Sequence, residues 1–157
     1  MNPRDDETVP DEPLPEHTRP DGVSDLTIEA LGKLSEALEV LEDARGSLYR
    51  FHRLTGTADL GIGEAVELFR KAGHHDIADR LDTEIVGRNV LEGRWTFQVI
   101  EEYDDGYFAA VKAADQAARD ELVGGRRHLW EAEMKERERT RGLPGHEARP
   151  HDGSSQG

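Results

Sequence analysis

Four carboxylate side chains surround Tyr103, and carboxylate oxygens are the ligands that hard cations prefer in proteins. They belong to Glu101, Glu102, Asp104 and Asp105. If these residues bind a metal, magnesium or calcium is the expected ion; no other cofactor is predicted. The alternative is that they lie at the amino terminus of a helix, where capping and the helix dipole favour acidic residues. The spacing of an EF-hand loop is absent, which favours the helix terminus.

A second candidate site involves two polar residues on the apolar face of an expected helix. Arg45 and His52 are seven residues apart, so both point toward the same partner as the leucines of that face. With Arg94 and Trp95 they predict a pocket between helices for a ligand or a protein partner. The alternative is that the polar ends of Arg45 and His52 reach solvent while their stems cover apolar surface.

The remaining histidines show no metal-binding pattern. No two histidines are spaced i, i+4, and the Glu-x-x-His motif of dimetal helical bundles is absent. His74 and His75 are expected at a junction between helices. His128 and Glu131 have the reverse order of that motif, which is a weak indication of a metal site.

Other catalytic motifs are also missing. Gly61-x-Gly63 and Gly124-Gly125 are not followed by Lys-Ser or Lys-Thr, so they are expected to be turns rather than phosphate-binding loops. No serine lies in a Gly-x-Ser-x-Gly motif. The chain has no cysteine, which excludes disulfides, thiolate metal sites and a cysteine nucleophile.

The charge of the chain restricts its partners. The 157 residues carry a formal net charge of -14, which disfavours binding to nucleic acid or to an anionic membrane surface. No run of about 18 apolar residues is present, and the first residues lack the apolar segment of a signal peptide. A cytoplasmic location and no membrane partner are therefore expected, and nucleic-acid binding is not.

Proline and glycine divide the chain into three parts. Residues 1 to 23 are acidic and contain five of the seven prolines, while residues 142 to 157 are rich in glycine and contain the other two. Both are predicted to be disordered tails because they offer little apolar surface for burial. Residues 24 to 141 contain no proline, as long helices require, and are predicted to form one helical domain.

Hydrophobic periodicity predicts about five helices in this domain. The first begins at Ser24 or Asp25 and ends near Leu54. A turn at residues 55 to 57 precedes a second helix to residue 72, and the third runs from residue 75 or 76 to about 92. The fourth begins at Asp104 or Asp105 and ends at Gly124-Gly125, and the last covers about 126 to 141.

More than half of the aromatic residues lie between Arg88 and Phe108. Because aromatic side chains bury large areas, the core is expected to centre on this stretch, with Trp95 as a core residue. The alternative places Trp95 at a binding site. The segment from Trp95 to Ile100 alternates apolar and polar residues like a strand, but without a partner strand it is expected to be extended or a short helix.

The sequence thus predicts an all-α protein, an irregular bundle of about five helices. We expect it to bind another protein or to self-associate as a homodimer, because the leucine face of the first helix exceeds the reach of the shorter helices. The residues predicted to form this interface are Leu31, Leu34, Leu38 and Leu41. The alternative is a small-molecule or divalent-metal-dependent enzyme with a site between helices.

Overall fold

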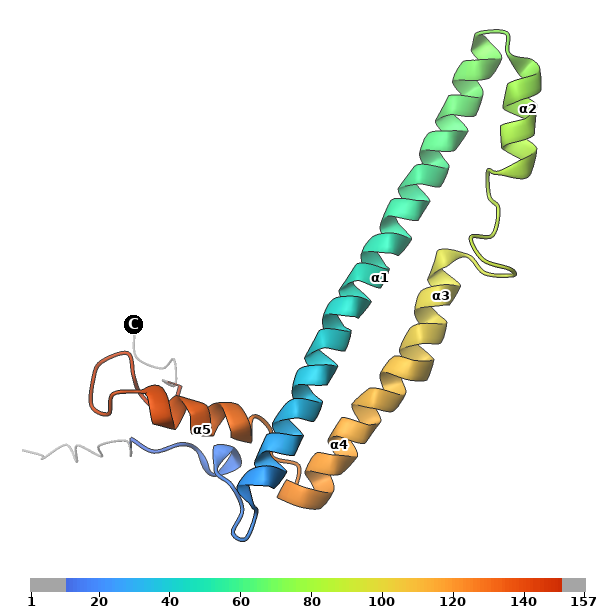
Figure 1. The fold of residues 1–157 in the computed structure, drawn as a ribbon. Helices are drawn as coiled ribbons and strands as arrows, with labels where there is room; N and C mark the ends of the chain where they lie inside the picture. The colour runs from blue at the N-terminus through green and yellow to red at the C-terminus, as the bar shows by residue number, and fades with distance from the viewer. Residues whose placement is uncertain (1–10, 151–157) are drawn as a thin grey trace, which may run out of the picture. The chain divides into compact units, whose positions relative to one another are not determined.

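The computed structural model describes residues 11–150 and confirms an all-α fold (Figure 1). Within these residues no β-strand occurs, and the only β-type pairing is an isolated bridge between Leu91 and Arg94. No helix in this part of the chain is both long and apolar enough to cross a membrane. The elements in order are the 3-10 turn η1 (Pro15–His17), α1 (Asp25–Lys71), α2 (His75–Glu84), α3 (Thr96–Tyr103), the π-helical turn η2 (Asp104–Phe108), α4 (Ala109–Val123) and α5 (Leu129–Glu138).

Helix α1 is uninterrupted over 47 residues, so the predicted turn at residues 55 to 57 and the separate second helix are wrong. Its start is as predicted, because the Ser24 hydroxyl accepts a hydrogen bond from the Thr27 amide (3.1 Å). The helix continues past Gly56 because its partly buried face continues and becomes apolar again at Ile62 and Val66. The residues after His52 keep the same steps of three and four: Thr55, Asp59, Ile62 and Val66.

Helix α3 begins earlier than the predicted fourth helix. Trp95 precedes its first turn in an extended conformation, and the Trp95 amide donates to the Gln98 side-chain oxygen (2.8 Å). This local cap makes Thr96–Tyr103 helical and resolves the ambiguity between strand and helix. Asp104 and Asp105 therefore lie inside a continuous helical segment, in η2, and the prediction that they cap a helix is wrong.

Glycines with positive φ mark the ends of the other helices. Gly73 (φ 85°) separates α1 from α2, and Gly87 (φ 73°) lies just after α2, which ends earlier than predicted. Gly124 and Gly125 end α4 as expected, because only glycine adopts this left-handed conformation without strain. α5 is shorter at both ends than the predicted last helix.

The chain divides into two compact units, residues 1–36 with 114–157 (unit 1) and residues 37–113 (unit 2). The described part of unit 1 has an apolar cluster of Ile28, Leu31, Val123 and Leu129, against which Val23 and Ala118 pack. Trp130 lies directly over Gly32, whose missing side chain allows the close approach: a Cβ there would lie 3.0 Å from Trp130 Cγ. This cluster joins α1, α4 and α5 within unit 1.

Next to the cluster, unit 1 buries the Asp115 carboxylate completely. Ser35 donates a hydrogen bond to Asp115 Oδ1 (3.0 Å), and Arg119 Nη1 lies 2.9 Å from Oδ2. The Arg119–Asp115 contact is close enough for an ion pair, but no N–H of Arg119 points at Asp115 Oδ2 as a hydrogen bond requires. Arg119 Nε has no hydrogen-bond partner among the described residues. Asp115 therefore depends on both neighbours for compensation of its burial.

Parts of both predicted tails lie in unit 1 and contact α5. Arg19 forms two 2.8 Å hydrogen bonds with Glu133 and a 2.6 Å ion pair with Asp25. Arg139 binds Asp11 (2.8 Å). The carbonyl of Glu12 accepts a 2.6 Å hydrogen bond from Arg149. Residues 11–23 and 142–150 thus make charge-assisted contacts that their low apolar content did not suggest, while residues 1–10 and 151–157 lie outside the described residues.

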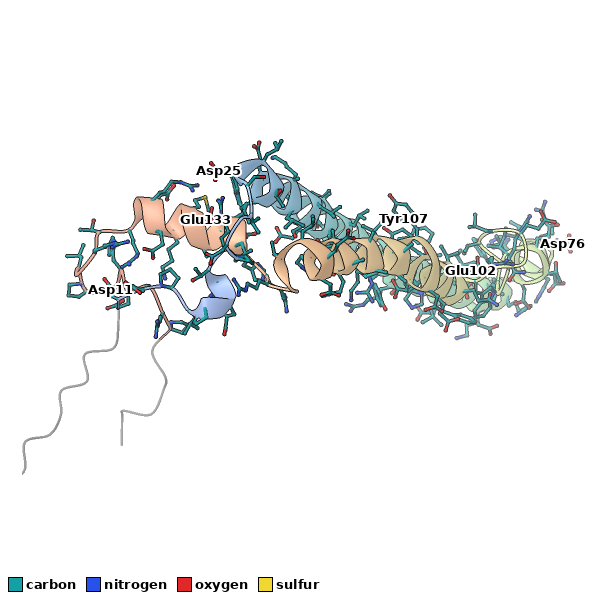
Figure 2. The ribbon with its side chains drawn as sticks, turned by 90° about the horizontal axis from the view of Figure 1, so that it is seen from below. Asp11, Asp25, Asp76, Glu102, Tyr107 and Glu133 are labelled. Carbon is teal, nitrogen blue, oxygen red and sulfur yellow. The ribbon has the colours of Figure 1, made fainter. Side chains whose placement is uncertain are left out.

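In unit 2 the later part of α1 packs against α2 and α3. Val66 and Ala78 are buried where α1 and α2 meet, and Ile100 and Phe108 are buried on α3 and η2. Arg70, near the end of α1, forms ion pairs with Asp79 and Asp82 of α2 (3.4 and 2.8 Å). Tyr107, in contrast, projects from the helix into solvent (Figure 2).

Candidate functional site

Unit 2 contains a pocket of about 290 Å³ between α1 and the segment that links α2 to α3. We call it the Trp95 pocket. Apolar atoms make up most of its wall. Its lining residues are Thr55, Gly56, Ala58, Asp59 and Ile62 of α1, together with Ile85, Gly87, Arg88, Asn89, Val90, Trp95 and Thr96. The small side chains of Gly56 and Ala58 leave the space that larger residues on a helix would fill.

Gly87 fixes the linker on this side of the pocket. Its amide donates to Asp59 Oδ1 (3.0 Å), and its carbonyl accepts a hydrogen bond from the Trp95 indole (3.2 Å). Both polar backbone groups of this one residue are therefore bound to side chains that line the pocket. Because Gly87 has φ 73°, a residue with a side chain would be strained there. The pocket is thus formed by specific contacts rather than by a loose loop.

Thr96, which lines the pocket, contacts His52 of α1. His52 Nδ1 lies 2.6 Å from the Thr96 hydroxyl, which joins α1 to the first residue of α3. Thr96 is buried and also lines the pocket. No other hydrogen bond or ion pair involves the His52 side chain in the described part of the chain. The pair therefore lacks the third group that orients a catalytic histidine toward a nucleophile.

Trp95 is 47% exposed, so the prediction that it is a core residue is wrong. Its neighbours Val90, Leu91 and Phe97 are exposed as well. The stretch from Arg88 to Phe108 contributes Thr96, Ile100 and Phe108 to the buried residues, but three of its five aromatic residues are exposed.

Arg45 occupies a different place from Trp95. Its guanidinium forms two hydrogen bonds with Asp104 (2.7 and 3.0 Å) and lies over the rings of Tyr49 and Phe108, 5.0 and 5.3 Å from their centroids. Hydrogen bonding to Arg45 lowers the pKa of Asp104. Neither residue lines the Trp95 pocket. Of the predicted pocket residues, Trp95 lines the pocket and His52 contacts it through Thr96. Arg45 lies outside the pocket.

Arg94, the fourth residue of the predicted pocket, forms an ion pair with Glu102 and does not line the pocket. This contact and the Arg45 contact occupy two of the four carboxylates around Tyr103. In residues 11–150 no group of three or more His, Asp or Glu side chains is placed to hold a metal ion. Glu101 and Asp105 are the two that form no hydrogen bond or ion pair among the described residues.

The leucines of the predicted homodimer interface differ in burial. Leu31 is buried in the core of unit 1 and is not available to a partner. Leu34, Leu38 and Leu41 are half-buried. The leucine face is long because α1 itself is long: it ends at Lys71, whereas the sequence predicted an end near Leu54.

Sequence reasoning missed most of the pocket wall. Asp59 and Ile62 were predicted in the second helix and Ile85 in the third, so their convergence with one another and with Thr55 was not foreseen. The signal that could have located them is the continuation of the helical spacing through residues 52, 55, 59, 62 and 66. Gly87 carried no distinctive signal, because its role depends on two partners that are distant in sequence.

Comparison with known proteins adds no family or fold relationship. No family model matches the chain, and neither a curated protein nor a solved structure matches it. The function must therefore be argued from the residues described above.

Proposed function

We propose that the chain is a protein-interaction protein that binds an apolar side chain of a protein partner in the Trp95 pocket. The observation that carries this proposal is a half-exposed tryptophan at an apolar pocket, with its indole N–H already bonded to Gly87. Tryptophan is enriched among residues that dominate binding energy at protein interfaces. A fixed ring lowers the conformational entropy that a partner would otherwise have to offset.

The surroundings of the pocket support a macromolecular partner. Val90, Leu91 and Phe97 add exposed apolar surface beside Trp95. A volume of about 290 Å³ is at the lower end for small-molecule sites, whereas a single apolar side chain needs less space. Arg88 and Asn89 supply the polar groups that typically surround the apolar centre of an interface.

The enzyme alternative rests on one observation, the short contact between His52 and Thr96. A threonine hydroxyl next to a histidine is part of a nucleophilic site, but a group that orients the histidine is also needed. Among the described residues His52 has no such partner. We therefore assign the pair a structural role, in which it holds α3 against α1.

Selection of random displayed peptides on the full chain tests the proposed function. Ala58→Trp fills the pocket from an exposed helix position, and Ala110→Trp, on α4, is the matched control. We expect selected peptides to share a large apolar residue and to bind Ala58→Trp about tenfold or more weakly, as loss of a central anchor implies. Binding to Ala110→Trp should be unchanged. Equal binding to both variants would contradict the proposal.

The enzyme alternative has its own test. Hydrolysis of p-nitrophenyl acetate by the wild type should equal that of Thr96→Val, because the hydroxyl is not a nucleophile in our assignment. A rate that depends on Thr96 and on His52, with unchanged helicity, would favour the enzyme over the interaction protein.

A further inference from the structure

A second apolar face of α1 is exposed in unit 2, on a different side from the leucines that pack within the chain. It follows steps of four and three residues, the spacing of a coiled-coil surface. We call it the α1 stripe; its residues are Ala37, Val40, Ala44, Ser47, Phe51 and Leu54. Val40 is 65% exposed, Phe51 45% and Leu54 57%. Three large apolar residues at heptad spacing on one open face require an explanation.

The residues beside the stripe carry complementary charges. Asp43 and Arg50 lie on its edge away from α3, seven residues apart, and both are exposed. Neither side chain forms a hydrogen bond or ion pair in the described part of the chain, whereas Arg45, Arg70 and Arg94 are all paired. Flanking charges of opposite sign select the orientation and register of paired helices.

An antiparallel pair of α1 stripes matches these features. When two copies are related by a two-fold axis, residues on the same edge of the stripe face each other. If Asp43 faces Arg50 of the second copy, the symmetry produces the ion pair twice. In the same register Val40 faces Phe51, Ala37 faces Leu54, and the small residues Ala44 and Ser47 meet at the centre. Large residues thus oppose smaller ones, and the centre permits close approach of the helices.

A parallel pair lacks this complementarity. In-register parallel helices place Phe51 against Phe51, and each edge residue such as Asp43 then faces the opposite edge of the stripe. That edge contains Leu41, Leu48 and Thr55, which are uncharged. Charge therefore favours the antiparallel orientation.

We propose that the α1 stripe binds a second copy of this chain in antiparallel orientation, with Asp43 facing Arg50 of that copy. The proposal does not require the Trp95 pocket. It also differs from an interface formed by Leu31, Leu34, Leu38 and Leu41, since those residues lie on another face of α1 and are buried or half-buried.

Charge exchange on the full chain tests the proposal by sedimentation equilibrium. Wild type is expected to dimerise, and Asp43→Arg or Arg50→Asp alone should raise Kd about tenfold or more, because each introduces two like-charge contacts. The double exchange Asp43→Arg with Arg50→Asp should restore the wild-type Kd to within about threefold. Both positions are exposed, so circular dichroism should be unchanged. A wild type that is monomeric up to about 100 μM overturns the proposal, as does a double variant no better than the single ones.

Cross-linking distinguishes the two orientations, and the absence of native cysteine makes it specific. In a mixture of Val40→Cys and Phe51→Cys chains under mild oxidation by diamide, the antiparallel pair should form the mixed disulfide. Disulfides between two Val40→Cys chains, or between two Phe51→Cys chains, should be absent. In the antiparallel pair the two identical cysteines are about 16 Å apart along the helix axis, at a rise of 1.5 Å per residue. Predominant disulfides between identical chains would mean a parallel pair and would overturn the proposal.

Discussion

Units 1 and 2 are stabilised in different ways. Unit 1 gathers four buried apolar side chains into one cluster beside the buried Asp115. In the described part of unit 2 the buried side chains are spread along α1, α2 and α3 without such a cluster, and polar pairs such as Arg45 with Asp104 join the helices. Unit 2 consequently leaves Trp95, Phe51 and Leu54 exposed.

This difference between the units indicates which surfaces are available to bind a protein partner. Exposed apolar side chains that do not contribute to a core are available to bind partners. They can follow one another at helical spacing on one face of a helix, or they can lie beside a pocket. Unit 2 has both kinds of surface, the Trp95 pocket and the α1 stripe. In unit 1 four apolar residues form the buried cluster, although Leu26 and Leu122 are exposed there as well. Mutations should therefore affect stability most in unit 1 and association most in unit 2.

The largest effect is expected for Asp115→Ala in unit 1. Removing the carboxylate deprives Arg119 of its ion-pair partner and leaves it only the hydrogen bond to Gln116 (2.9 Å); loss of one member of a buried ion pair costs about 3–5 kcal/mol. Chemical denaturation measures this loss. Ser35→Ala removes only a hydroxyl donor and should cost about 1 kcal/mol. Equal, small losses for both variants would mean that Asp115 is solvated rather than buried.

A smaller difference is expected between two apolar truncations on α1. Ile28→Ala should lower the free energy of unfolding by about 2–5 kcal/mol, because Ile28 is fully buried in the cluster of unit 1. Leu54→Ala should change it by no more than about 0.5 kcal/mol when measured on the monomer. A comparable loss at both positions would show that the α1 stripe is part of a core.

Glycines within α1 provide a third comparison. Gly46→Ala should stabilise the chain by roughly 0.5–1 kcal/mol, because alanine favours the helix and nothing lies within 4 Å of the new methyl group. Gly32→Ala should have the opposite sign, since its methyl group would lie 3.0 Å from Trp130. Thermal unfolding of the two variants against wild type gives both signs. Stabilisation by Gly32→Ala would mean that Trp130 moves easily.

The smallest expected effect concerns the Arg45 contact of unit 2 and depends on pH. Arg45 lowers the pKa of Asp104 in the folded protein, so folding favours the ionised carboxylate. The contribution to stability is complete at neutral pH and is lost as the pH falls below the ordinary aspartate pKa of about 3.9 toward the lower folded value.

Urea denaturation of wild type and Asp104→Asn at several pH values measures this contribution. The variant should be less stable at pH 7, and the difference should shrink below about pH 4, where the Asp104 carboxylate of the unfolded chain begins to bind a proton while that of the folded protein stays ionised. A difference that is independent of pH would show that the Asp104→Asn substitution acts through packing instead.

The sequence alone determined the helical class and several helix ends. The proline-free central region, the cap at Ser24, and the stops at Gly73 and Gly124-Gly125 are local features, and local hydrogen bonding and φ preferences are sufficient to produce them. The leucine spacing identified a face of α1 that is buried or half-buried, although the sequence analysis interpreted it as a homodimer interface.

Tertiary structure decided the rest. The expected turn at residues 55 to 57 does not form, because packing of Ile62 and Val66 continues the buried face and outweighs the low helix propensity of Gly56. Trp95 lies at a pocket rather than in a core because Asp59 and Trp95 both bind Gly87, residues that the sequence keeps apart. Likewise, only the packing of α2 and α3 on one side of α1 determines that Phe51 and Leu54 face outward. Periodicity identifies apolar faces, but which of them is covered depends on contacts between residues far apart in the chain.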